Sequence, residues 1–163
     1  ITGVTKTDYG IFDFAKRIHS LTARYPNKTV RVHIDPYSTQ NLIPINTVVS
    51  YLMRTLEVNE LPAIMNFIAK NSMKNIQLIN SVCKLLPIDI TLVGHIEVGE
   101  MDALERIIHA GMSFSSNYID TNILFDTKNL NSIILGPGDE VNEKSVFKMI
   151  KYFFDNISSN GGK

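Results

Sequence analysis

An amphipathic helix pattern that leads directly into an alternating strand pattern is the strongest constraint on the fold of this chain. Residues 11–25, IFDFAKRIHSLTARY, place their apolar side chains on one helical face. A Pro-Asn pair ends that helix, and residues 29–35, TVRVHID, then alternate between apolar and polar side chains. Because a one-sided strand and a one-sided helix each need an apolar partner, the sequence predicts helices packed on a sheet.

The rest of the chain also contains helix and strand patterns, and together they predict the α/β class. The β-branched residues of 45–58 predict a second strand. The full predicted order is a helix at 11–25, strands at 29–35 and 45–58, helices at 61–70 and 75–86, a strand at 88–98, a helix at 101–111 closed by Gly111, a buried strand at 131–135 and a helix at 144–157. We interpret this order as an α+β sandwich with helices on one face of a sheet, followed by a C-terminal strand–helix portion of an α/β domain.

The net charge indicates which partners the chain can bind, and the cysteine content indicates the compartment in which it folds. Sixteen basic residues balance sixteen acidic ones, so the sequence favours neither nucleic acid nor an anionic membrane as a partner. No apolar stretch approaches the roughly 20 residues of a membrane span. The lone Cys83 has no internal disulfide partner and lies on an apolar helical face, which indicates a core residue in a reducing cytoplasm. Because the chain begins with Ile1, we expect it to start inside a longer or processed protein.

Two short motifs carry side chains that bind metals in other proteins. His33 and Asp35 are two residues apart on an expected strand and so share a face, as do His95 and Glu97, with Glu100 following in the next turn. No second cluster of ligands is close to either motif in the sequence. We therefore favour polar strand surfaces over a metal site for both motifs.

The turn GPGD at 136–139 follows an expected buried strand. Gly136 and Gly138 permit backbone angles that other residues avoid, and they expose amide N–H groups. At the carboxyl end of a strand, such a turn can bind an anion or a substrate carboxylate.

Three stretches together carry a family resemblance: NLIP at 41–44, NYIDTNILFD at 117–126 and SIILGPGDEVNE at 132–143. They resemble the two-zinc amidohydrolase and peptidase family of acetylornithine deacetylase, succinyl-diaminopimelate desuccinylase and carboxypeptidase. In that family a lid, or dimerisation domain, is inserted into a zinc-binding catalytic domain. The resemblance implies a lid-like domain at 1–98 and a C-terminal catalytic segment at 99–163.

The resemblance also implies a detailed lid. Helices at 12–25 and 61–70 would lie on one face of a sheet that contains strands at 30–35 and 48–56. A helix in place of either strand would overturn this arrangement. The family pairs its lids through edge strands or helices, so the resemblance implies a homodimer.

Site residues follow from the resemblance position by position. Asn41 and Arg54 would contact the substrate from the lid, with Arg54 pairing with a carboxylate. Gly136 and Gly138 would line the pocket. The substrates would be N-acyl amino acids or small peptides, and the complete family uses zinc as its cofactor. Asp120 and Glu143 are the carboxylates closest to the implied metal position.

Departures from the family pattern are equally specific. The family's zinc-binding His between Gly-Pro-Gly and Asn-Glu is missing here, and Asp139 is followed directly by EVNE. The family's lid His is replaced by VTKTD, and its Gly-Gly before NLIP is replaced by Pro36 and Tyr37. The His-x-Asp and paired-Glu ligands of the family's first catalytic half do not precede the lid-like region.

Three readings remain open. The chain is a portion of a metal-dependent amidohydrolase that is incomplete or inactive alone, or it is a non-catalytic dimerisation or binding module of the same ancestry. The third reading is an unrelated α/β domain in which NLIP and GPGD are ordinary turns.

A metal analysis tests whether this chain lacks the ligands for zinc. We predict that the 163-residue chain binds no stoichiometric zinc and hydrolyses no N-acetyl amino acid, because a catalytic zinc needs about three protein ligands and this pattern lacks them. Elemental analysis that finds roughly one or two zinc ions per chain would contradict this reading. His33 and Asp35 would then be the first residues to mutate.

Overall fold

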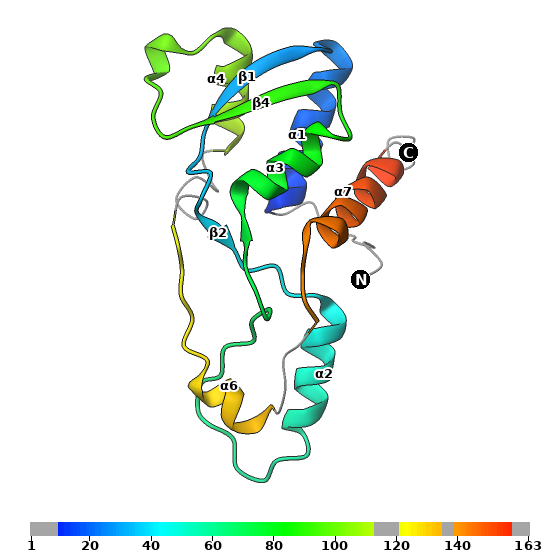
Figure 1. The fold of residues 1–163 in the computed structure, drawn as a ribbon, viewed down its shortest axis with the longest axis vertical. Helices are drawn as coiled ribbons and strands as arrows, with labels where there is room; N and C mark the ends of the chain where they lie inside the picture. The colour runs from blue at the N-terminus through cyan, green and yellow to red at the C-terminus, as the bar shows by residue number, and fades with distance from the viewer. Residues whose placement is uncertain (1–9, 113–120, 135–138, 158–163) are drawn as a thin grey trace.

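The computed structural model describes residues 10–112, 121–134 and 139–157. The fold is mixed α/β, as the sequence predicted, and it forms two lobes along its long axis (Figure 1). The larger lobe contains α1 (Ile11–Arg24), β1 (Lys28–His33), α3 (Asn75–Cys83), β4 (Ile88–Val93), the 3-10 turn η1 (Val98–Glu100), α4 (Ala103–Met112) and α7 (Glu143–Ile157). The smaller lobe contains α2 (Ile45–Thr55) and α6 (Lys128–Ile133), and the two-residue strands β2 (Thr39–Gln40) and β3 (Met73–Lys74) lie between the lobes.

Helix α1 and strand β1 form where the sequence predicted them. The buried side chains of α1 include Phe14, Ala15 and Ile18, which lie on the predicted apolar face. Gly10 precedes the helix with φ of 61°, in the left-handed region that glycine enters without steric cost. The predicted helices at 75–86, 101–111 and 144–157 are also confirmed, as α3, α4 and α7.

Strand β1 pairs in parallel with β4, in a register that runs from Lys28 opposite Ile88 to His33 opposite Val93. Parallel strands need a long crossover between them, and here the intervening chain includes α3. Val30 and Val32 of β1 are buried. The two strands therefore share one apolar face, which the helices of the larger lobe cover.

The core of the larger lobe joins elements that are far apart in the sequence. Its most deeply buried side chains come from α1, β1, α3 and α7: Ile18, Val30, Val82, Val146 and Ile150. The segments 1–98 and 99–163, which the resemblance divides into two domains, therefore contribute to one core in the described residues.

The strand predicted over 45–58 is wrong. This stretch forms helix α2, which follows Pro44 in an extended conformation. Thr47, Tyr51 and Thr55 are its buried residues, and their four-residue spacing is helical. The strand prediction weighted the β-branched residues, whose intrinsic strand preference is weak and depends on context.

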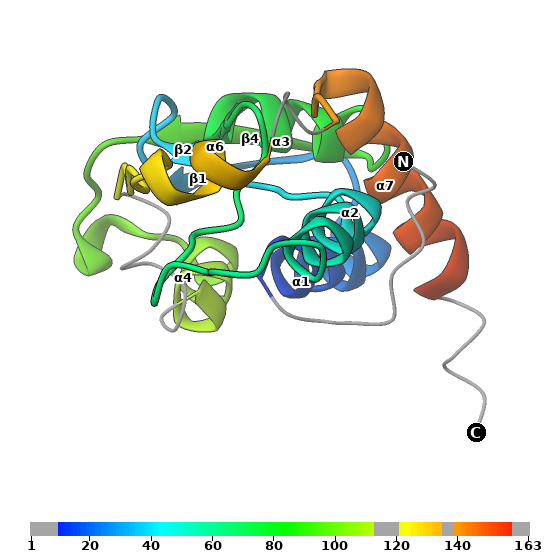
Figure 2. The same cartoon turned by 90° about the horizontal axis from the view of Figure 1, so that it is seen from below.

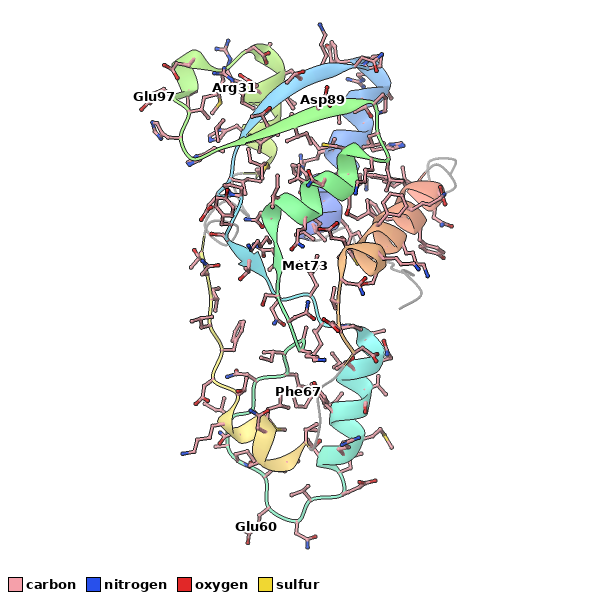
Figure 3. All side chains as sticks on the ribbon, in the orientation of Figure 1. Arg31, Glu60, Phe67, Met73, Asp89 and Glu97 are labelled. Carbon is pink, nitrogen blue, oxygen red and sulfur yellow. The ribbon has the colours of Figure 1, made fainter. Side chains whose placement is uncertain are left out.

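Two further elements differ from the prediction. Residues 61–70 are irregular rather than helical, and Lys128–Ile133 form the short helix α6 where a strand was expected at 131–135. The described part of 131–135 contains no strand. Both differences have one physical reason, because these stretches pack on α2 and not on a sheet. Phe67 lies between α2 and α6 (Figure 3), with its ring edge-to-face on Tyr51 at 5.5 Å.

The lid sheet that the resemblance implied is therefore not formed by residues 48–56. Strand β1 takes β4 as its neighbour, while α2 lies in the other lobe beside α6 (Figures 1 and 2). A helix in place of either lid strand excludes the implied lid arrangement, and α2 is such a helix.

Gly111 has a different role from the predicted one, because it lies inside α4 and does not end it. A Cβ atom at this position would lie 2.9 Å from Cδ of Arg17. The neighbouring atoms belong to the flexible, half-exposed Arg17 side chain, which can move aside, so a small side chain at this position should cost little.

A buried carboxylate ties α4 to the outer edge of β1. The Glu105 side chain is 5% exposed and accepts hydrogen bonds from the Arg31 backbone N–H at 2.9 Å, from Arg31 Nε at 2.8 Å and from the Asp102 backbone N–H at 3.0 Å. The Arg31 guanidinium holds the pKa of Glu105 down at about 2, from an ordinary value of 4.5. The ionised carboxylate therefore satisfies donors at a sheet edge that would otherwise lack partners.

Replacing this carboxylate should destabilise the fold in a pH-dependent way. We predict that Glu105→Gln lowers the free energy of unfolding by about 2 kcal/mol at pH 7, because an amide cannot accept from donors on both of its sides. The folded pKa is below the unfolded one, so the wild-type advantage is complete above about pH 4.5 and is lost as the pH falls toward about 2. Urea titrations of both proteins across this range measure the difference.

The exposed Asp89 of β4, labelled in Figure 3, provides the control. Asp89→Asn should change the free energy of unfolding by less than about 0.5 kcal/mol. Equal stabilities of wild type and Glu105→Gln at neutral pH would contradict the role assigned to Glu105.

Candidate functional site

An open polar depression of about 420 Å³ lies where the two lobes meet. Met73, which lines it, lies between the lobes in Figure 3. Three segments supply its lining residues: Asn71, Ser72, Met73, Gln77, Glu140, Val141, Asn142, Glu143 and Lys144. The volume lies within the range of about 300–1,000 Å³ that is typical of small-ligand sites, although those are usually more apolar.

The start of α7 forms one wall of the depression. Asn142 and Ser145 cap the helix reciprocally, since the Asn142 N–H donates to Ser145 Oγ at 2.9 Å and the Ser145 N–H donates to Asn142 Oδ1 at 3.0 Å. This pattern satisfies two of the first N–H groups of the helix. Glu143 is in the first turn, where the helix dipole favours a negative charge.

A two-point clasp holds the segment before α7 against the opposite wall. The Val141 N–H donates to Asn71 Oδ1 at 3.0 Å, and Asn71 Nδ2 donates back to the Val141 carbonyl. Gln77 extends this contact, because its Nε2 donates to Glu143 Oε1 at 3.1 Å while its Oε1 accepts from the Lys74 N–H at 3.0 Å. The Glu143 carboxylate is therefore oriented by its neighbours before any ligand binds.

The GPGD turn contacts the residues that follow NLIP, next to this depression. Asp139, the last residue of GPGD, accepts hydrogen bonds from Asn46 Nδ2 and, at 3.4 Å, from Thr47 Oγ1 in the first turn of α2. That turn follows NLIP directly. The structure therefore brings Asn46 and Thr47 into contact with Asp139.

The site residues predicted from the resemblance divide into three groups. Glu143 lines the depression, and Asn41 borders it, since Asn41 Oδ1 accepts from the Ala69 N–H at 2.9 Å and its Nδ2 donates to the lining residue Ser72 at 3.5 Å. Arg54 is exposed in the last turn of α2, in the smaller lobe, and does not line the depression. Gly136, Gly138 and Asp120 lie outside the described residues.

Sequence reasoning missed Asn71, Gln77 and Lys144. Gln77 could have been found, because a side-chain acceptor three residues into a helix is a recognised start signal. Asn71 gave no local signal, since its partner Val141 is 70 residues away.

The lining of the depression does not fit zinc. It contains two carboxylates, Glu140 and Glu143, and neither histidine nor cysteine, whereas a catalytic zinc is held by about three protein ligands that include histidine or cysteine. Over all the residues that the structure describes, no group of three or more His, Cys, Asp or Glu side chains is arranged to hold a metal. We therefore derive no metal-dependent step from this site.

The structure also brings together the two histidine motifs that were separate in the sequence. The rings of His33 and His95 lie edge-to-face with centroids 5.9 Å apart, and His95 Nε2 is 2.7 Å from Glu97 Oε1. His33 also borders a small cavity of about 30 Å³ between β1 and α4, which is large enough to hold a water molecule. His95 and Glu97 are largely exposed, in keeping with the polar surface that the sequence indicated.

Cys83 is half-buried in the described fold and has no disulfide partner there. Burial raises the pKa of its thiol, which reduces the thiolate fraction. The side chain is suited to packing and not to nucleophilic attack.

Comparison with known proteins gives this chain no family: no protein-family model and no curated protein matches it. None of the helices in the described ranges combines the length and apolar character needed to cross a membrane.

The Asn71 clasp should control the mobility of one wall of the depression. We predict that Asn71→Ala raises the hydrogen-exchange rate of the buried Val141 amide and lowers the free energy of unfolding by about 1–2 kcal/mol, because two hydrogen bonds are lost. Asn80→Ala, at an exposed position on α3 that does not line the depression, is the matched control. Unchanged exchange at Val141 in Asn71→Ala would refute the clasp.

Proposed function

We propose that this chain is a binding module for small N-acyl amino acids or peptides, the portion of a metal-dependent amidohydrolase that contacts substrate without supplying the metals. The observation that supports this most is that residues 140–144, which follow the GPGD turn, line one polar depression, while Asp139 of that turn contacts Asn46 and Thr47 just after NLIP. Two segments of the same resemblance are therefore in contact next to the depression, through Thr47 and Asp139, which are 92 residues apart.

The charges of the depression fit a ligand of mixed charge. Lys144 offers an ammonium group to a ligand carboxylate, while Glu140 and Glu143 offer carboxylates to a ligand cation. Lys70 lies 3.9 Å from Glu140 and partly neutralises it, so Glu143 is the stronger candidate for a cation. The Ser72 hydroxyl and the Asn142 side chain border the same space and can bond to an acyl amide.

The same geometry also supports the second reading, a binding module of the same ancestry with no catalytic role. The lining supplies hydrogen-bonding groups and charge but no general base paired with a nucleophile. The two readings differ in whether the parent gene encodes the His-x-Asp and paired-Glu ligands of the family's first half.

We further propose a cytoplasmic location. The single cysteine of the sequence is half-buried as a free thiol, a state that a reducing compartment maintains.

N-acetylornithine is a suitable probe, because it carries a carboxylate, a cation and an acyl amide. We predict that it binds more tightly than N-acetylglutamate, which lacks the cation. Glu143→Gln should weaken N-acetylornithine binding about tenfold, a loss of about 1.4 kcal/mol, through the missing ion pair. Titration of the full chain, followed by amide chemical shifts, gives the affinity and locates the site.

Asn80→Ala again serves as the control and should bind as the wild type does. Shifts confined to residues outside the depression, equal affinity for the two probes, or an unchanged affinity in Glu143→Gln would each overturn the proposed function.

A further inference from the structure

Helix α2 buries one face in the smaller lobe and leaves the opposite face apolar and exposed. Its buried side chains are Thr47, Tyr51 and Thr55. The other face carries five large apolar side chains that are 50–79% exposed, here called the α2 stripe: Ile45, Val49, Leu52, Met53 and Leu56. An exposed apolar row of this kind marks an interaction surface.

The spacing of the stripe identifies the shape of its partner. Ile45, Val49, Leu52 and Leu56 follow one another in steps of four, three and four residues. This is the spacing of the seam in paired helices, where each side chain fits between residues of the facing helix. Of the helices in the described ranges, α2 is the one that exposes such a seam, so the same helix in a second copy is a matched partner.

We propose that the α2 stripe binds the α2 stripe of a second copy of this chain, with the two helices antiparallel across a two-fold axis. A two-fold interface uses the same surface on both subunits, which an apolar and uncharged seam allows. The single charged residue of α2 is Arg54. It points away from Leu52, since successive residues turn by about 100° around a helix, so the pairing brings no like charges together.

The area available suits a modest interface. A large aliphatic side chain buries on the order of 100 Å² of apolar surface, so five that are 50–79% exposed offer roughly 300 Å². A standard interface covers about 800 Å² per partner, of which somewhat more than half is apolar. The stripe therefore supplies most of the apolar part, and Leu61, 53% exposed and five residues beyond Leu56, can extend it.

The edge of the sheet is a poorer surface for pairing. The resemblance implied a homodimer through lid edge strands or helices, but the outer edge of β1 is occupied, because the Arg31 N–H already donates to the Glu105 carboxylate. A strand edge whose donors are satisfied does not recruit a second strand. Among the described residues, the α2 stripe carries no such competing contact, which makes the helical contact the better candidate of the two.

Sedimentation equilibrium of the full chain tests the proposal between roughly 10 and 500 µM, the range suited to a small interface. The wild type should rise from 18.3 kDa toward twice that mass. Leu52→Glu places a charge at the centre of the stripe and should remain at 18.3 kDa. Ser50→Glu places the same charge on an exposed position of α2 outside the stripe, and it should dimerise as the wild type does.

Circular dichroism first establishes that each variant is folded, and Leu56→Lys replaces Leu52→Glu if the latter unfolds. A wild type that stays monomeric throughout overturns the proposal, and the stripe then belongs to another occupant, either a segment of the polypeptide outside the described residues or a different protein. A Leu52→Glu or Leu56→Lys variant that dimerises normally overturns it as well. Leu52 does not line the polar depression, so titration of the monomeric variant with N-acetylornithine tests the proposed function independently.

Discussion

The packing of α7 against α3 and α1 is the interaction on which the rest of the larger lobe depends. Val82, Val146 and Ile150 are almost completely buried there, and each contributes on the order of 1.5–3 kcal/mol through the hydrophobic effect. Once the two helices are packed, their first turns lie close together, and the chain segments that lead into them must meet. The bond between Gln77 and Glu143 is then a consequence of apolar packing, because a single such hydrogen bond, worth about 1 kcal/mol net, could not hold two helices in place.

The smaller lobe is built differently. Its buried cluster consists of Tyr51, Leu130 and Ile134 with a few half-buried neighbours. Much of its chain is irregular and is held by side-chain amides, as where Asn66 Nδ2 donates to the Asp126 carbonyl and Asn129 Nδ2 donates to the Ile64 carbonyl. This small core covers only the face of α2 that carries Tyr51. The exposed stripe is therefore the result of a lobe that contains too few apolar partners for its main helix.

Sequence reasoning succeeded where the local pattern and the tertiary contact agreed. Helices α1 and α7 have a continuous apolar face against the core, and β1 alternates against the same core, so the periodicity alone located them. It failed at 45–58, where β-branched residues indicated a strand while the buried residues follow a four-residue spacing. It also failed at 61–70, whose apolar side chains contact α2 and α6 without helical structure. Of the residues singled out from the sequence, Glu143 lines the depression, whereas the lining residue Asn71 depends on a contact 70 residues away that no local pattern encodes.

The helical state of 45–55 also decides which side chains can serve one ligand. Asn41 is anchored to the Ala69 N–H and faces Ser72, whereas Arg54 lies ten residues beyond Pro44 in sequence, which is about 15 Å along a helix. The implied lid would bring the Arg54 guanidinium back toward Asn41 by placing residues 48–56 as a strand beside β1. Neither side of β1 is open to such a strand, because β4 pairs with one side and Glu105 contacts the other. Under the proposed function, a ligand in the depression would therefore meet the cation of Lys144 and not a two-pronged arginine. The proposed recognition of a carboxylate would then rest on a single flexible ammonium group, an arrangement that suits small ligands which also satisfy Glu143.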